Sequence, residues 1–151
     1  MASTIGIQYA VELPDLPQRD ALRRWARGAL DAAGASGALA IRVVDEAESA
    51  ALNRRWRGKP GPTNVLSFTL TLPPGVEANE LGDVVICAPV VAREAAQQDK
   101  APAAHWAHMV VHGVLHLLGH DHNLAPDAQR METLETEILA RLGFPDPYQA
   151  A

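Results

Sequence analysis

A chain of 151 residues, 48% of them hydrophobic, is long enough for one compact domain with a substantial core and too short for two. Its net charge of −5 argues against a protein that grips nucleic acid over its whole surface, although a local basic patch is compatible with it. No apolar run approaches the ~20 residues that cross a bilayer, and no export signal is visible, which predicts a cytoplasmic location without membrane attachment. The single cysteine, Cys87, excludes an internal disulfide framework and lies in an apolar run that predicts a buried side chain.

The predicted elements alternate along the chain. Period-two apolar patterns between turn residues predict strands at 4–13, 38–44, 63–70 and 82–88. Helical spacing of apolar residues, with capping signals such as Asp45 and Gly34, predicts helices at 18–33, 45–56, 89–98, 103–118 and 126–142. Strands in the first half with helices between and after them predict one α+β domain over 1–151, in which about five helices pack on a small mixed four-stranded sheet.

A basic cluster ends the second predicted helix. In "NRRWRGK", three arginines and Lys59 surround Trp56. Charge alone favours a solvated helix end whose cations complement the C-terminus of the helix, and the alternative is a local patch for phosphate groups. Trp56 fits a core or helix-end role better than stacking on a base, although stacking stays open.

The segment "HMVVHGVLHLLGHDH" contains a metal-ligand pattern. His112 and His116 are four residues apart on a predicted helix, so both imidazoles project from one face within reach of one ion. Gly119 then ends the helix, and His122 can supply a third ligand after the turn, in the pattern H-x3-H-x5-H. Three protein ligands leave a position for water, which is typical of catalytic zinc. The pattern predicts one Zn²⁺ per chain.

The neighbouring histidines fit a ligand role less well. His105 and His108 lie earlier on the helix, farther from the turn that delivers a third ligand, and are predicted to be helix-face residues. His120 shares the loop with His122, but we expect its side chain to point elsewhere. Asp121 either accepts a hydrogen bond from the second ring nitrogen of a ligand or braces the turn.

Gly113 stands where a zinc peptidase carries its catalytic glutamate. The H-E-x-x-H motif uses that glutamate to take a proton from the zinc-bound water, and here the segment reads H-G-V-L-H, which argues against peptide hydrolysis. Glycine inside a helix costs roughly 1 kcal/mol relative to alanine, so something is expected to pass close to the backbone. We expect Gly113 to clear space beside the ion.

The histidine segment, together with "RGKPGPTNVLSF", "LGDVVICAP" and the ending "METLETEILARLGFPDPY", closely resembles the YbeY family of bacterial endoribonucleases, also called rRNA maturation factors. The resemblance covers nearly the whole chain and implies a zincin-like metal site on a central helix. It implies that His112, His116 and His122 bind zinc, and that Arg57 and His116 belong to the catalytic centre. Asp83, in "LGDVV", either neighbours that site or ends a loop.

The resemblance also implies a function. Such proteins cleave single-stranded RNA in 16S rRNA 3′-end maturation and in ribosome quality control, so the expected partners are ribosomal RNA, the small ribosomal subunit, a ribosomal protein and an assembly GTPase, with no role for DNA or a membrane. Arg57 would present a fork of donors matched to phosphate oxygens. The alternative is a ribosome assembly or binding factor whose zinc is structural and whose intrinsic nuclease activity is small.

Overall fold

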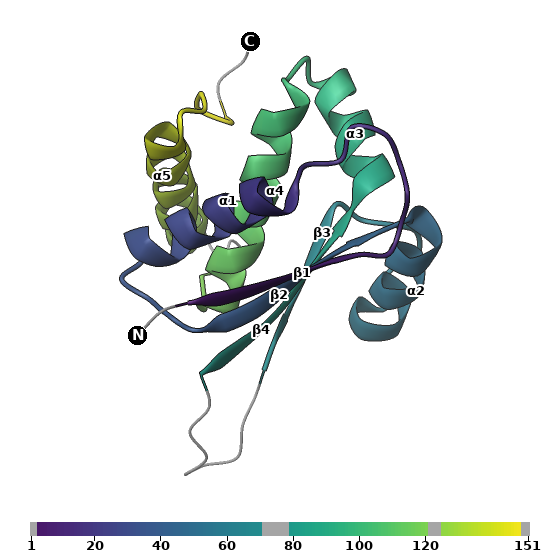
Figure 1. The fold of residues 1–151 in the computed structure, drawn as a ribbon, viewed down its shortest axis with the longest axis horizontal. Coiled ribbons are helices and arrows are strands. Elements are labelled where there is room, and N and C mark those ends of the chain that lie inside the picture. The colour runs from purple at the N-terminus through teal and green to yellow at the C-terminus, as the bar shows by residue number, and fades with distance from the viewer. Residues whose placement is uncertain (1–2, 71–78, 121–124, 149–151) are drawn as a thin grey trace.

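A four-stranded sheet forms the centre of the fold. The computed structural model describes residues 3–70, 79–120 and 125–148 (Figure 1). Within these residues the strands are β1 (Thr4–Tyr9), β2 (Ala38–Val44), β3 (Val65–Thr69) and β4 (Glu80–Cys87), in the order β1-β2-β4-β3. β1, β2 and β4 are parallel, and β3 pairs antiparallel with β4 at one edge. The predicted mixed four-stranded sheet is therefore confirmed.

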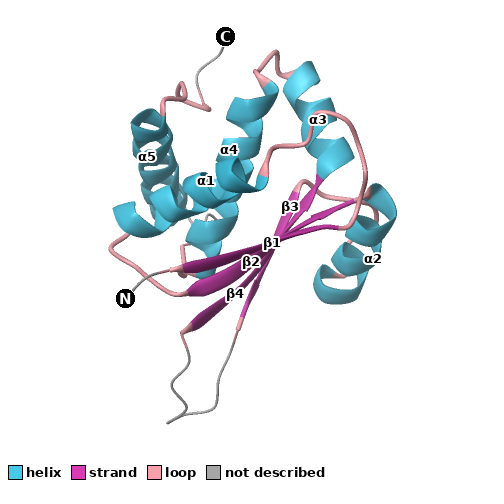
Figure 2. Ribbon diagram, in the orientation of Figure 1, coloured by secondary structure: helices cyan, strands magenta, loops and turns pink. Residues whose placement is uncertain are grey.

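The helices begin and end within one residue of their predicted bounds. Figure 2 shows them in cyan around the magenta sheet. In the described ranges they are α1 (Arg19–Ala32), α2 (Glu46–Arg57), α3 (Ala88–Gln97), α4 (Pro102–Leu117) and α5 (Ala125–Leu142). The predicted cap at the start of α2 is present, because the Asp45 carboxylate accepts a hydrogen bond of 2.9 Å from the Glu48 N–H. The first strand is shorter than predicted: its last pair joins Tyr9 to Val43, and β1 ends where β2 turns toward α2.

The two faces of the sheet are covered unequally. The larger core lies on one face, where α1 and α4 pack against the sheet and α5 packs against these two helices (Figure 1). Alternate strand residues such as Ile41 and Val84 are fully buried in this core. On the opposite face, a smaller cluster that includes Leu66, Val85 and Cys87 packs beneath α2. Cys87 is thus buried as predicted. The small size of this second cluster leaves much of that face open.

Close packing brings α4 onto the sheet at Gly113. A Cβ atom there would lie 2.5 Å from Val84 Cγ1 and 3.2 Å from Val65 Cγ2, so only glycine allows this approach. As predicted, other atoms lie close to the Gly113 backbone. They belong to side chains of β3 and β4, so the glycine makes room for the sheet and does not clear space beside an ion. The Ser67 hydroxyl donates a 2.8 Å hydrogen bond to the Gly113 carbonyl oxygen, which joins β3 to α4 at this level.

Candidate functional site

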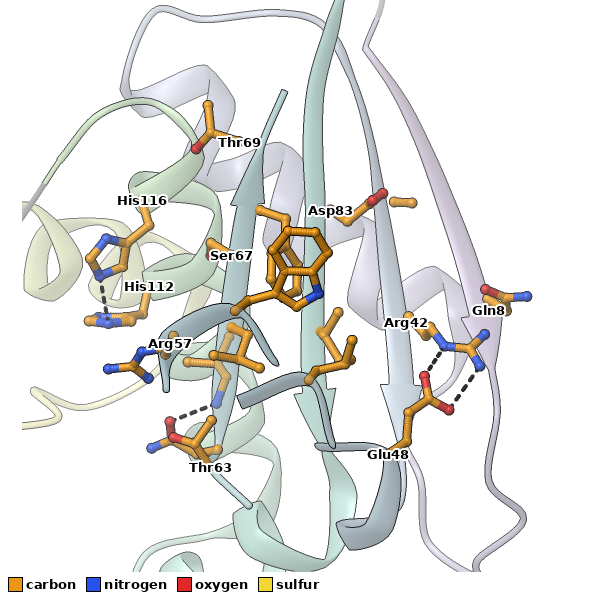
Figure 3. Close-up of a pocket in the computed structure, with 18 of the residues that line it drawn as sticks. Gln8, Arg42, Glu48, Arg57, Thr63, Ser67, Thr69, Asp83, His112 and His116 are labelled. Atoms are coloured by element: carbon orange, nitrogen blue, oxygen red, sulfur yellow. Dashed lines mark hydrogen bonds and ion pairs between the residues drawn. The ribbon is translucent and has the colours of Figure 1, made fainter. Parts of the chain in front are cut away.

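A groove of about 1370 Å³ extends from α4 past the edge strand β3 and over the open face of the sheet (Figure 3). Strand alternation explains its lining, because Arg42 and Asp83 face the groove whereas their neighbours Ile41 and Val84 enter the larger core. Asp83 lies inside β4 and lines the groove, so of its two predicted alternatives the place beside the site agrees with the structure and the loop end does not. The polar groups of the groove come from all four strands, α2, α4 and the turn after α4.

Two histidines converge at one end of the groove. His112 and His116 lie four residues apart on α4, and their Nε2 atoms are 3.1 Å apart (Figure 3). Two nitrogens bound at ~2.0–2.1 Å to one tetrahedral zinc would be separated by about 3.3 Å. The pair therefore has a donor type and a spacing compatible with a shared metal ion. The third predicted ligand, His122, and its neighbour Asp121 lie outside the described residues.

A buried carboxylate contacts the ring nitrogen of His112 that faces the protein interior. Glu135, on α5, is 1% exposed, and its Oε1 atom lies 3.3 Å from Nδ1 of His112. Its Oε2 atom lies 2.5 Å from Nε2 of His108, and the Tyr148 hydroxyl donates to Oε1 at 3.0 Å. A carboxylate that accepts from Nδ1 fixes the imidazole in the tautomer whose Nε2 atom can bind a metal.

The same contacts determine the charge of Glu135. Burial raises the pKa of this carboxyl, but the hydrogen bonds from His108 and His112 outweigh that effect and lower its pKa to about 2. Glu135 is therefore ionised at neutral pH. Burial, and then the neighbouring Glu135 carboxylate, raise the pKa of the Tyr148 hydroxyl, which consequently keeps its proton and acts as the donor.

His108 belongs to this buried group, which differs from its predicted role as a simple helix-face residue. Ligand atoms of His108, His112 and Glu135 lie within 4.8 Å of one another, so these three residues form a second grouping that could hold an ion. The side chains of His108 and Glu135 are only 10% and 1% exposed, whereas His112 and His116 line the groove. His112 and His116 are thus the histidines of α4 that face the groove, and Glu135 lies on the interior side of His112.

The two remaining described histidines are His105, which is buried, and His120, which follows α4. Nε2 of His105 lies 2.9 Å from the Glu94 carboxylate, and burial lowers the pKa of this imidazole. The predicted helix-face role of His105 is therefore consistent with its position. His120 follows the helix and lines the groove with His112 and His116, which differs from the expectation that its side chain points elsewhere.

Arg57 shares the groove with the histidine pair. It is the last residue of α2, and Gly58 ends the helix directly after it with a φ of 66°, which favours glycine. Figure 3 shows Arg57, His112 and His116 on the same side of the groove. Glu48 holds the other lining arginine, Arg42, at 2.5 and 2.9 Å. Among the described residues, by contrast, no hydrogen bond or ion pair engages the exposed Arg57 guanidinium.

Sequence reasoning missed Glu135 and Tyr148. A signal for Glu135 was present, because the buried positions of α5 are Met131, Glu135, Ile138 and Leu139, which places a carboxylate on the apolar stripe of the helix. A charged residue at such a position requires a buried partner. Tyr148 follows the last helix, where no periodicity indicates which way a side chain faces.

The fold and the site together define a class: a small α+β protein with a candidate metal centre on its central helix, at the end of an open groove. Residues 11–143 match the sequence model of the family described as Endoribonuclease YbeY. The chain belongs to this family, as the resemblance in its motifs implied. In the described part of the chain, no helix is both long and apolar enough to cross a membrane.

Relatives named Endoribonuclease YbeY are similar over nearly all of the chain. The protein from Halorhodospira halophila is 57% identical over 136 residues, which cover 88% of each chain. The protein from Nitrosococcus oceani is 52% identical over 152 residues, 99% of each chain. A solution structure of a Thermotoga maritima protein matches with a TM-score of 0.60 and 22% identity, covering 97% of this chain and 99% of that one, which supports the fold alone.

Proposed function

We propose that this protein is a zinc-dependent endoribonuclease that cleaves single-stranded RNA. The observation that carries the proposal is the convergence of the His112 and His116 Nε2 atoms, 3.1 Å apart, in the same groove as the Arg57 guanidinium, which no other described residue engages. Membership of the family and the names of the relatives support the reaction type. The proposed biological role is 16S rRNA 3′-end maturation and ribosome quality control in the cytoplasm.

Each residue has a distinct task in this proposal. His112 and His116, with His122, would hold one zinc ion per chain, and a bound zinc would supply Lewis acidity toward a phosphoryl oxygen. Glu135 orients the His112 imidazole. The Arg57 guanidinium offers planar, charged donors that match two phosphate oxygens and stabilise negative charge as it builds up during phosphodiester cleavage.

The charge of the chain bears on the substrate. With a net charge of −5, the protein as a whole does not attract a nucleic-acid backbone, and phosphate contacts along that backbone provide most nonspecific affinity. We infer that it acts on RNA that is already held in the small ribosomal subunit, in company with a ribosomal protein and an assembly GTPase. Neither DNA nor a membrane is a proposed partner.

Metal removal tests the proposal. Purified protein should contain about one zinc per chain, and chelation should abolish cleavage of a single-stranded oligoribonucleotide until zinc is restored. Metal analysis and gel-based cleavage assays measure the two quantities, with a DNA oligonucleotide of the same sequence as the control. Cleavage that persists in metal-free protein contradicts the proposal. Zinc-loaded protein that binds small subunits without cleaving RNA would instead indicate an assembly factor with a structural metal.

A substitution of Glu135 tests its support of the metal. Glu135→Gln should lower the zinc affinity about 10- to 100-fold, because the amide no longer presents a charged acceptor to the His112 imidazole. Competition with a chromophoric chelator measures the affinity, and circular dichroism checks the fold. The matched control is Glu132→Gln, an exposed position on the same helix. Unchanged affinity would leave Glu135 with a purely structural role, and a loss as large as that of His112→Ala would make it a direct ligand.

A further inference from the structure

Trp56 is exposed at the end of α2, beside Arg57. Its side chain is 60% exposed, whereas the other two tryptophans, Trp25 and Trp106, are 3% and 4% exposed. Burying an aromatic side chain of this size would contribute substantially to the stability of the core. Of the two predicted roles, the exposed position excludes the core and agrees with the helix end, and the indole lines the groove that contains the histidine pair.

The indole is supported from inside the protein. The ring of Phe68, on β3, lies 6.1 Å from the Trp56 ring at an interplanar angle of 67°, an edge-to-face contact. Phe68 and Leu52 in turn pack against the smaller core cluster of the open sheet face. Trp56 therefore packs against apolar side chains that are themselves anchored to the core. Its side chain should lose little conformational entropy when it binds a ligand.

The face of the Trp56 indole contacts the planar, charged guanidinium of Arg55. The guanidinium carbon of Arg55 lies 5.1 Å from the Trp56 ring centroid, a cation–π contact. A nucleobase is also planar, and it stacks on exposed tryptophan in a manner that tolerates any base sequence. Arg55 lies over the ring and Arg57 lines the same groove as the indole, so cations that attract a phosphate backbone accompany the aromatic surface.

We propose that Trp56, supported by Phe68, is the surface on which an unpaired nucleobase of the substrate stacks while Arg57 contacts an adjacent phosphate. This inference rests on the proposed endoribonuclease function and assigns it a positioning residue. A base inside a duplex has both faces covered by its neighbours, so stacking on Trp56 selects single-stranded RNA. The preference for single strands then resides on α2 and not on the histidine helix.

Binding without cleavage tests this proposal independently of catalysis. In the His116→Ala background, Trp56→Ala should weaken binding of a short labelled single-stranded RNA about tenfold, or about 1.4 kcal/mol, whereas Trp56→Phe should retain most of the affinity. Fluorescence anisotropy measures the affinity. Leu13→Ala, which removes an exposed apolar side chain outside the groove lining, is the matched control and should bind as the parent protein does.

Abasic substrates locate the contact. When single bases along the RNA are removed one at a time, the affinity of the parent protein should fall most at one position. For the Trp56→Ala variant, removing the base at that position should cause no additional loss of affinity. Equal losses at every position, or unchanged affinity of Trp56→Ala, would overturn the role of Trp56. In cleaving protein, Trp56→Ala should raise KM and leave kcat nearly unchanged. The wild-type protein could also bind RNA through Trp56 and show no nuclease activity. That result would uphold the stacking role and reject the proposed reaction.

Discussion

His116→Ala should lose zinc and RNA cleavage together. The Nε2 atom of His116 lies 3.1 Å from that of His112, and removing it takes away one of the two imidazoles that α4 itself contributes to the groove. A Lewis acid contributes several kcal/mol to charge stabilisation, and each 1.36 kcal/mol is a factor of ten in rate, so cleavage should fall by about 10³-fold or more. Metal analysis and single-turnover cleavage measure the two effects.

Two further histidine variants make this result specific. His105→Gln alters a buried histidine on the same helix that pairs with Glu94, outside the groove lining, and should keep both zinc and cleavage. His108→Gln distinguishes the two groupings that share His112. If the ion lies among His108, His112 and Glu135, His108→Gln loses the metal and His116→Ala retains it, which is the reverse of our expectation.

Arg57→Glu should keep zinc and lose cleavage. Arg57 lines the groove from α2, and no described metal-site residue bonds to its guanidinium, so metal binding should be unaffected. Removing one donor that stabilises transition-state charge costs about 10²- to 10³-fold in kcat, and the introduced carboxylate adds repulsion toward phosphate. Arg57→Lys should fall between wild type and Arg57→Glu, because it keeps the charge but not the planar fork.

The control for Arg57 lies three residues earlier. Arg54→Glu changes the net charge by the same amount in the same turn of α2, but Arg54 is not among the groove-lining residues. It should cleave RNA nearly as well as the wild type. Equal losses in the two variants would indicate a general effect of charge on RNA attraction. An Arg57→Glu protein that cleaves RNA normally but no longer associates with ribosomes would favour the assembly factor.

Local signals account for how well the helices could be predicted. α2 begins where Asp45 caps the Glu48 N–H and ends at Gly58 in the left-handed region, and both effects act within a single turn. The convergence of His112 and His116 is likewise local, since residues four apart on a helix share a face. These parts of the site therefore follow from spacing in the sequence.

The remaining features depend on contacts between distant segments. Glu135 reaches His112 only because α5 packs against α4, and Arg57 reaches the groove of the histidines only through the placement of α2. The expectation that Gly113 clears space beside the ion was wrong because it also depended on a distant contact. The distance between Gly113 and Val84 is set by how α4 lies on the sheet. No periodicity within one element contains this information.

The hydrogen bond from Ser67 to Gly113 has a consequence for the durability of activity. It joins an edge strand, which has only one neighbour in the sheet, to the buried helix that carries the histidine pair. A local opening of one segment costs less free energy than unfolding of the whole domain. The fold can therefore persist under mild heat or denaturant while the groove loses its shape, so that inactivation precedes unfolding. Substitutions that hold β3 in place should prolong the working life of the protein more than substitutions that tighten its core.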